Sequence, residues 1–328
     1  MLRIIEEKSE IAKLNSILKD QLDKVSNKKV RAVLGFKHTS FPTTISVIDR
    51  LNYWHLSGKQ ENRFTNLFGV GSPSKGQAVN VVTEINIPFK GIDRRIGGAF
   101  AADKNRNVYL VHRGKIGGGR TGIGKKVFLR NYIGKLTPVE DGERVSRVAP
   151  IGKLKSIKLP IQIKGFIDEV NRIKNLSISE PQKLIPSKTY GFSEEYSKIR
   201  QYKVSTNIET SCDHAVIVNE LSKKLKALGY QIGNDQCRDL FILNNKKQIS
   251  VVFEVKSDVS TTNTYTAIGQ LLLNNVDLKN KPDLFFVNSE DIPEDLIKKL
   301  LKLGIKTLKY VWKDDTIIFN ELNKLKMM

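Results

Sequence analysis

The sequence has little cysteine, no long apolar run and a deficit of acidic residues. Cys212 and Cys237 are the only cysteines among 328 residues, too few for a disulfide framework and without the spacing of a zinc motif. No stretch approaches the roughly 18 apolar residues that span a bilayer, and because the N-terminus is charged we expect no signal peptide. We therefore expect a cytoplasmic protein with reduced thiols and no membrane partner.

The basic residues outnumber the acidic ones, 55 to 34, which gives a formal net charge of +21. Residues 1–194 hold 35 basic and 17 acidic residues, whereas residues 195–328 hold 20 and 17. Such an excess favours a polyanionic partner, and we expect double-stranded DNA. The asymmetry indicates a basic binding half followed by a near-neutral half with a different task.

Length and composition indicate two domains. A chain of 328 residues with 40% hydrophobic residues is long enough for two buried cores. The polar stretch 177–195 contains Pro181 and Pro186 and lacks periodicity, so we interpret it as a linker. We expect a mixed α/β DNA-recognition domain over 1–176 and a second domain over 196–328.

In the first half, Ile4, Ile11, Leu18 and Val25 recur every seven residues and predict an amphipathic helix over 2–25. This helix either packs on its own domain or forms a dimerisation coil. A strand is predicted over 78–88 and a hairpin over 99–111. The aromatic residues Tyr53, Trp54, Phe64 and Phe68 belong to a core or to a pocket for a flipped base.

The second half alternates helices and strands. The pattern predicts helices over 213–228, 264–275 and 293–303, and strands over 239–243, 249–256, 284–287, 306–312 and 316–319. The apolar runs in the strands indicate a sheet that is covered on both faces, which is an α/β domain.

Three charged residues interrupt an otherwise apolar hairpin in this half. Asp239 opens one predicted strand, and Glu254 and Lys256 lie near the end of the next. Side chains alternate along a strand, so Glu254 and Lys256 point to the same side, and the antiparallel pairing places Asp239 opposite them. Burying these charges is costly unless an ion compensates them. The alternative is a surface ion pair between Glu254 and Lys256 on an edge strand.

Two carboxylates suit Mg²⁺, which takes its remaining ligands from water and phosphate. A lysine beside such an ion can activate a water molecule or neutralise charge on a phosphate, which indicates phosphodiester hydrolysis. We therefore expect Asp239 and Glu254 to bind the metal and Lys256 to act in catalysis.

The sequence between residues 210 and 290 resembles the PD-(D/E)xK nuclease family, on the strength of Asp239, Glu254-Val255-Lys256 and the flanking helices. The resemblance implies a restriction-endonuclease-like fold, a mixed central sheet flanked by helices. It implies that Asp239 and Glu254 bind Mg²⁺ and that Lys256 assists the attacking water. The family's proline before the first acid is absent, and Arg238 stands there.

The resemblance also implies two further site residues. Many members carry a glutamate on the preceding helix, for which Glu220 is the candidate and Glu209 a weaker one. Some carry a glutamine on the following helix, where Gln270 stands. Glu220 as a solvated residue and Gln270 as a core residue are the alternatives. We interpret His214 as a structural residue near the start of its helix.

The segment 104–135 holds nine basic residues and no acidic one, and it is rich in glycine. Glycines let a backbone approach phosphates closely, so we expect the segment and the nearby arginine pair to contact DNA. The alternatives are a solvated loop and a P-loop at Gly119-x4-Gly124-Lys125, which Lys126 disfavours because Ser or Thr belongs there. The candidate DNA-binding residues are Arg94, Arg95, Arg113, Lys115, Arg120, Lys125 and Lys126.

Together these observations favour an Mg²⁺-dependent DNA endonuclease, of the restriction type, with an N-terminal recognition domain. A repair or recombination nuclease that reads DNA structure or modification is the alternative, as is a DNA-binding regulator with an inert nuclease-like domain. Because one chain offers one site for two DNA strands, we expect a homodimer at least during cutting.

Overall fold

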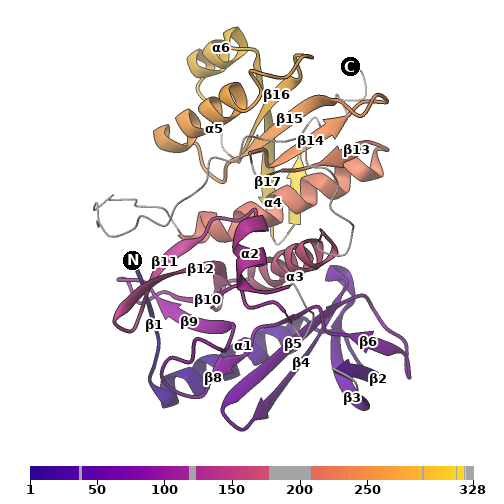
Figure 1. Ribbon diagram of the computed structural model, residues 1–328, viewed down its shortest axis with the longest axis vertical. Helices are drawn as coiled ribbons and strands as arrows, with labels where there is room; N and C mark the ends of the chain where they lie inside the picture. Colours follow the sequence, from indigo (N-terminus) through magenta and orange to yellow (C-terminus); the bar gives the residue numbers. More distant parts are fainter. Residues whose placement is uncertain are drawn as a thin grey trace.

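In the computed structural model, residues 1–36, 39–117, 123–176, 208–235, 237–289, 292–314, 316–320 and 322 are described. Their strands form three sheets, two within residues 2–153 and one within residues 231–319. We call residues 1–176 the N-terminal unit and residues 208–322 the C-terminal unit, the lower and upper parts of Figure 1. The chain is therefore mixed α/β, as expected, and the predicted linker over 177–195 lies outside the described residues.

Five strands of the N-terminal unit close into a barrel in the order β1, β11, β12, β10, β9. Asp103 fixes the predicted hairpin of β9 and β10, because its carboxylate accepts hydrogen bonds from the backbone N–H groups of Asn105 and Asn107 in the turn. The hairpin prediction is thus confirmed. The bounds are β1 (Leu2–Ile4), β9 (Gly98–Ala102), β10 (Val108–His112), β11 (Thr137–Asp141) and β12 (Arg144–Lys153).

A second sheet follows the order β6, β2, β3, β4, β5, β7, with β8 also paired to β5. The single strand predicted over 78–88 is wrong. The segment makes three short strands because it pairs first with β2 and then, at the opposite edge of the sheet, with β5. The elements are β2 (Lys28–Phe36), β3 (Thr39–Ile48), the 3-10 helix η1 (Asp49–Leu51), β4 (Tyr53–Gln60), β5 (Arg63–Val70), β6 (Ala78–Asn80), β7 (Thr83–Glu84) and β8 (Ile87–Pro88).

The aromatic stretch of this sheet belongs to the core. Tyr53, Trp54, Phe64 and Phe68 are all buried, and none of them lines the pocket of about 300 Å³ between the end of β5 and β6. The residues that line that pocket, Val70–Pro73, Gln77–Asn80 and Val82, include no charged side chain. The structure therefore supports the core interpretation of these aromatic residues over the base pocket.

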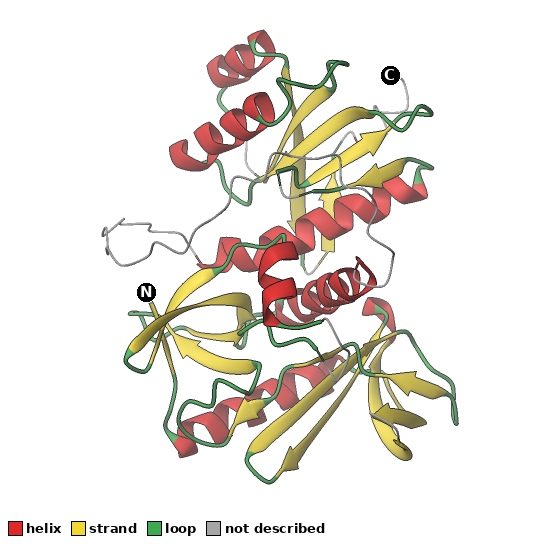
Figure 2. Cartoon of the chain, in the orientation of Figure 1, coloured by secondary structure: helices red, strands yellow, loops and turns green. Residues whose placement is uncertain are grey.

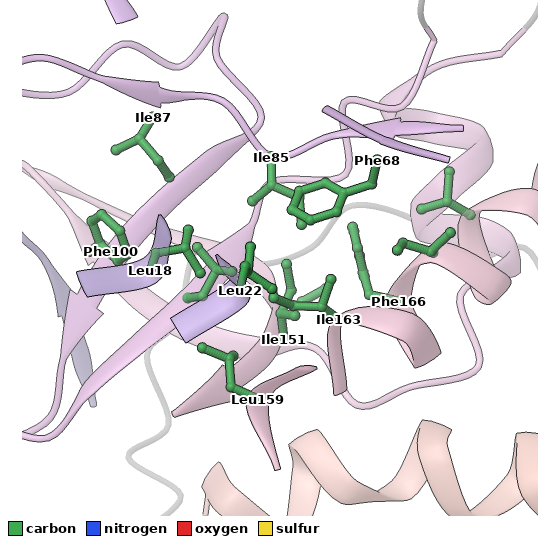
Figure 3. Close-up of a cluster of buried hydrophobic side chains, with 14 of the residues drawn as sticks. Leu18, Leu22, Phe68, Ile85, Ile87, Phe100, Ile151, Leu159, Ile163 and Phe166 are labelled. Carbon is green, nitrogen blue, oxygen red and sulfur yellow. The ribbon is translucent and has the colours of Figure 1, made fainter. Parts of the chain in front are cut away.

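The helix α1 (Lys8–Val25) packs on its own unit. It begins later than predicted, because residues 2–4 form β1 and the Glu7 carboxylate caps the helix by accepting a hydrogen bond from the Glu10 N–H at 2.6 Å. Leu18 and Leu22 of α1 meet Phe68, Ile163 and Phe166 in a shared core, drawn in Figure 3. The apolar stripe of α1 is thus buried inside the chain.

Two more helices complete the N-terminal unit. The segment 151–176, which the sequence pattern leaves unassigned, forms the end of β12 and then α3 (Leu159–Leu176). The short α2 (Lys125–Asn131) starts in the basic segment, and Phe128 anchors it by packing against Tyr132 and Phe166. Figure 2 shows α2 and α3 on the side of the N-terminal unit that faces the C-terminal unit.

The C-terminal unit is a six-stranded mixed sheet in the order β13 to β18. Its predicted alternation of helices and strands is confirmed, with β13 as one additional strand. Strands β15, β16 and β17 are parallel, and the other pairs are antiparallel. The elements are α4 (Ile208–Ala227), β13 (Gln231–Gly233), β14 (Leu240–Leu243), β15 (Ile249–Val255), α5 (Thr261–Leu273), β16 (Asp283–Asn288), α6 (Glu294–Lys302), β17 (Ile305–Lys313) and β18 (Thr316–Phe319).

Helices cover both faces of this sheet. Val252 packs with residues of α5 and α6, whereas its neighbour Phe253 packs with residues of α4, because successive side chains point to opposite faces. Both faces are therefore dry, which explains the near-continuous apolar runs in the strands. Of the helices in the described part of the chain, none combines the length and the apolar character needed to cross a membrane.

Candidate functional site

The hairpin of β14 and β15 places the two predicted acids side by side. Leu240 pairs with Phe253, so Asp239, one residue before β14, lies opposite Glu254 on β15. One Asp239 oxygen, Oδ2, accepts a hydrogen bond from the Val255 N–H at 2.8 Å. The charged cluster therefore sits at the point where two strand ends meet, as the alternation argument predicts.

Lys256 joins the acids to the following helix. Its Nζ donates hydrogen bonds to Glu254 Oε1 at 2.5 Å and to Gln270 Oε1, on α5, at 2.9 Å. Its backbone N–H donates to the Val287 carbonyl at 2.9 Å, which continues the pairing with β16 and holds the end of β15 in place. Hydrogen bonds thus join Glu254, Lys256 and Gln270, and Asp239 lies beside them on the neighbouring strand end.

The carboxylates of Asp239 and Glu254 differ in pKa. Burial and the negative charge of Asp239 raise the pKa of Glu254 to about 7, against the opposing charge of Lys256. Burial also raises the pKa of Asp239, but the charges of His214 and Lys256 outweigh it and hold that pKa below its ordinary value. At neutral pH the site therefore carries one ionised carboxylate, Asp239, and one that is partly protonated, Glu254.

His214 is a member of the site that its sequence interpretation missed. Its Nε2 lies 3.4 Å from Asp239 Oδ1, and both side chains are largely buried. Burial lowers the pKa of His214, but Asp239 more than offsets this and raises it above the ordinary value. The available signal was spacing: His214 stands three residues before Ile217 and seven before Leu221, on the buried face of α4.

Glu220 is not brought into the site. Its carboxylate accepts a hydrogen bond from Lys223 Nζ, on the same helix, at 2.5 Å. Glu220 lies six residues beyond His214, so it points away from the face that meets Asp239. Its placement supports the alternative of a solvated helix residue. The weaker candidate, Glu209, has no described side chain.

Arg238 holds the loop before Asp239. Its Nη1 donates to Asp235 Oδ2 at 2.6 Å, and its Nε donates to Asn275 Oδ1 at 2.7 Å, beside the C-terminal end of α5. It also donates to the Asn274 carbonyl. A positive charge is favourable at a helix C-terminus. The residue that replaces the expected proline therefore fixes the position from which Asp239 enters the site.

The donor set fits Mg²⁺. Asp239 and Glu254 offer carboxylate oxygens, and Mg²⁺ takes its other ligands from water and phosphate. A bound cation would supply the positive charge that favours ionised Glu254. Among the described residues, no three His, Cys, Asp or Glu side chains gather as a metal-ligating group. An Mg²⁺ ion here would be held by these two carboxylates and by water or phosphate.

Three arginines of the predicted DNA-binding set, Arg94, Arg95 and Arg113, are tied to acidic partners. Arg113 is buried, and its Nη2 donates to Asp141 Oδ1 at 2.8 Å. Arg94 Nε donates to the same carboxylate at 3.3 Å, and Arg95, on the surface, pairs with Asp93. The interior position of Arg113 does not support the DNA contact predicted for it, because its guanidinium holds the barrel together.

The lysines of that set are on the surface. Lys115, Lys125 and Lys126 are exposed, and the two last start α2. Arg120 lies outside the described residues, as does Gly119 of the P-loop alternative. The exposed members of the predicted set that the structure describes in this segment are thus lysines, which neutralise phosphates as point charges.

Lys135, the last residue of the basic segment, lies close enough to the C-terminal unit for the charges of Lys256 and Asp258 to act on it. Burial and the positive charge of Lys256 lower the pKa of Lys135, and the negative charge of Asp258 opposes them. The segment as a whole was predicted to contact DNA, but its sequence does not identify this one lysine. The C-terminal end of the basic segment therefore lies near the candidate site.

Comparison of the chain with protein-family models, with curated proteins and with solved structures finds no match in any of the three.

Proposed function

We propose that this protein is a divalent-metal-dependent DNA endonuclease with a restriction-endonuclease-like C-terminal unit of the PD-(D/E)xK type. One observation carries the proposal: Asp239, Glu254 and Lys256 converge where β14 and β15 meet, inside an apolar surrounding. A surface ion pair does not account for this arrangement, because the Glu254 side chain is only 2% exposed. Burial of an incompletely compensated acid is characteristic of functional sites.

In this proposal Asp239 and Glu254 hold Mg²⁺, which when bound stabilises negative charge on the phosphate and makes water more acidic. Lys256 lies beside Glu254 and is oriented by Gln270. From this position its ammonium group can orient the attacking water or neutralise the charge that develops on the phosphate. Arg238 and Val255 contribute by fixing the direction of the Asp239 carboxylate.

We assign DNA binding to the N-terminal unit. The net charge of +21, the exposed Lys115, Lys125 and Lys126, and the proximity of Lys135 to Lys256 support this assignment. Phosphate contacts of this kind position a duplex without reading its sequence. DNA that follows the basic segment would pass the candidate site.

We further propose that two copies act together through α5. The helix carries no charged residue over Thr261–Leu273. Two copies with a net charge of +21 each would therefore repel each other little if they met through α5. Tyr265 and Leu273 are 68% and 75% exposed, lie two turns apart on one face, and flank Gly269. The alternative coil over 2–25 is disfavoured because the apolar stripe of α1 is buried in its own core.

A cleavage assay tests the endonuclease proposal. Unmodified and methylated phage DNA would be incubated with the protein in Mg²⁺ or EDTA, beside the variants Asp239→Asn and Lys256→Ala. We expect discrete, Mg²⁺-dependent fragments that both variants lose while they retain DNA binding. Fragments from methylated DNA alone, or a smear, would instead indicate a modification- or structure-directed nuclease. Tight DNA binding without cleavage would favour the inert regulator.

A further inference from the structure

Helix α4 of the C-terminal unit also packs against the N-terminal unit. Cys212, near its N-terminal end, packs in the cluster of the N-terminal barrel, whereas Val216 and Leu221 pack under the C-terminal sheet. Figure 1 shows α4 between the two units and beside α3. Helices α3 and α4 approach each other closely: a Cβ atom at Gly165 of α3 would lie only 3.1 Å from the Val216 side chain of α4. The position of α4 is therefore set from both sides.

Asp213 is the polar anchor of α4 to the N-terminal unit. One oxygen, Oδ2, accepts a hydrogen bond from Lys158 Nζ at 2.9 Å, and the other accepts one from Gln162 Nε2 at 2.8 Å. Lys158 directly precedes α3, and Gln162 lies in its first turn. Both carboxylate oxygens are thus satisfied by the N-terminal unit, in a partly buried location where such bonds are strong.

The next residue, His214, faces the other unit. Its Nε2 lies 3.4 Å from Asp239 Oδ1, while Asp239 Oδ2 accepts the hydrogen bond from the Val255 N–H. Asp239 is thus held from two directions, by β15 and by α4. Because neighbouring helical residues point about 100° apart, one rigid turn of helix carries both the anchor to α3 and the contact with Asp239.

We infer that His214 is a positioning residue for Asp239, and that the N-terminal unit sets its position through the contacts of Lys158 and Gln162 with Asp213. The inference rests on the proposed function and adds a regulatory property to it. The unit that binds DNA would hold the cutting site in its productive geometry. Displacement of α3 from α4 would release the turn that carries His214 and thereby loosen Asp239.

The test compares single-turnover cleavage, DNA affinity and Mn²⁺ affinity in five full-length variants. His214→Ala should lower both the cleavage rate and the Mn²⁺ affinity, measured by titration calorimetry, by about tenfold or more. His214→Gln, whose amide N–H can replace Nε2, should recover most of both losses. Asp213→Ala and Lys158→Met should slow cleavage by roughly tenfold while DNA affinity stays unchanged, because a small displacement at the site is costly.

Lys223→Met is the matched control, since it removes an ion pair on another face of α4. It should leave all three measurements unchanged. Wild-type protein that cuts no DNA would overturn the proposed function. Wild-type cleavage with an equally active and equally Mn²⁺-binding His214→Ala variant would overturn the positioning role alone. If Asp213→Ala and Lys158→Met both cut at the wild-type rate, the coupling to the N-terminal unit would be wrong.

Discussion

The two units handle buried charge in opposite ways. In the N-terminal barrel, Arg113 and Asp141 form a pair in which the guanidinium also donates to the Gly98 carbonyl, and Arg113 holds the pKa of Asp141 below its ordinary value despite burial. In the C-terminal unit, burial and Asp239 raise the pKa of Glu254. A buried charge pair that is compensated thus supports the fold, whereas two buried acids with incomplete compensation indicate a site.

The largest effect is expected from breaking the compensated pair. Arg113→Met should reduce the free energy of unfolding by about 3–5 kcal/mol, because Asp141 is left buried without its main partner. Lys115→Met, two residues later on the surface, should change it by less than about 0.5 kcal/mol. Urea titration followed by circular dichroism measures both. Equal stabilities would show that the barrel pair is no more structural than the surface.

The next prediction concerns the effect of Glu254 on the free energy of unfolding of the metal-free protein. Glu254 has a raised pKa, so its protonated form is favoured in the folded state and the fold loses stability as pH rises from about 4.5 to about 7. Glu254→Gln should therefore stabilise the protein at pH 8 by up to about 3 kcal/mol and have little effect at pH 4. It should also abolish cleavage. The readout is the unfolding free energy in EDTA at the two pH values.

Asp141→Asn should change the free energy of unfolding in the opposite direction from Glu254→Gln. The pKa of Asp141 is lowered, so its ionised form stabilises the fold above its ordinary value of 3.8, and this contribution disappears as pH falls through the lowered pKa. The substitution should destabilise the protein at neutral pH. If Glu254→Gln and Asp141→Asn both stabilised or both destabilised the protein at pH 8, the proposed difference between the two units would be wrong.

A smaller effect is expected at the proposed contact between copies. Leu273→Glu places a charge on the uncharged face of α5 and should weaken dimerisation on DNA by about tenfold, or roughly 1.4 kcal/mol. Val145→Glu, at another exposed apolar position in the N-terminal unit, is the control. Analytical ultracentrifugation with a short duplex distinguishes them. Plasmid cleavage should shift from double-strand breaks to nicks in the α5 variant alone, unless the copies meet elsewhere.

The smallest effect concerns the surface lysines. Replacing Lys125 and Lys126 with alanine should weaken DNA binding severalfold on any sequence and reduce the salt slope of log K by about 2, one for each lost phosphate contact. Fluorescence anisotropy at several salt concentrations measures the slope. The stability should stay unchanged, in contrast to Arg113→Met. An unaltered slope would remove α2 from the DNA-binding surface.

The sequence was most informative where local pattern decides geometry. Alternation along β15 and the hairpin turn were enough to bring Asp239 to Glu254 and Lys256, since strand register converts spacing into contact. It could not separate Arg113 from Lys115, because burial of an arginine depends on where Asp141 lies, 28 residues away.

His214 and Glu220 show the same limit. Both are polar residues on one helix, and only tertiary packing decides which face meets Asp239. The helical period alone favours His214 over Glu220 for the buried face, since His214 aligns with Ile217 and Leu221. Arg238 gave no such signal, because its partners, Asn274 and Asn275, are brought near it by the fold.

The ends of the sheets have a consequence for solution behaviour. The outermost strands of the C-terminal sheet, β13 and β18, span only three and four residues, and the five-stranded barrel closes on itself. Short or closed borders offer few unpaired backbone groups on which another chain could add a strand. The C-terminal sheet and the barrel are therefore poor templates for strand addition, whereas in the second N-terminal sheet β3 pairs with β4 only over Ser46–Ile48 and leaves the rest of that edge open.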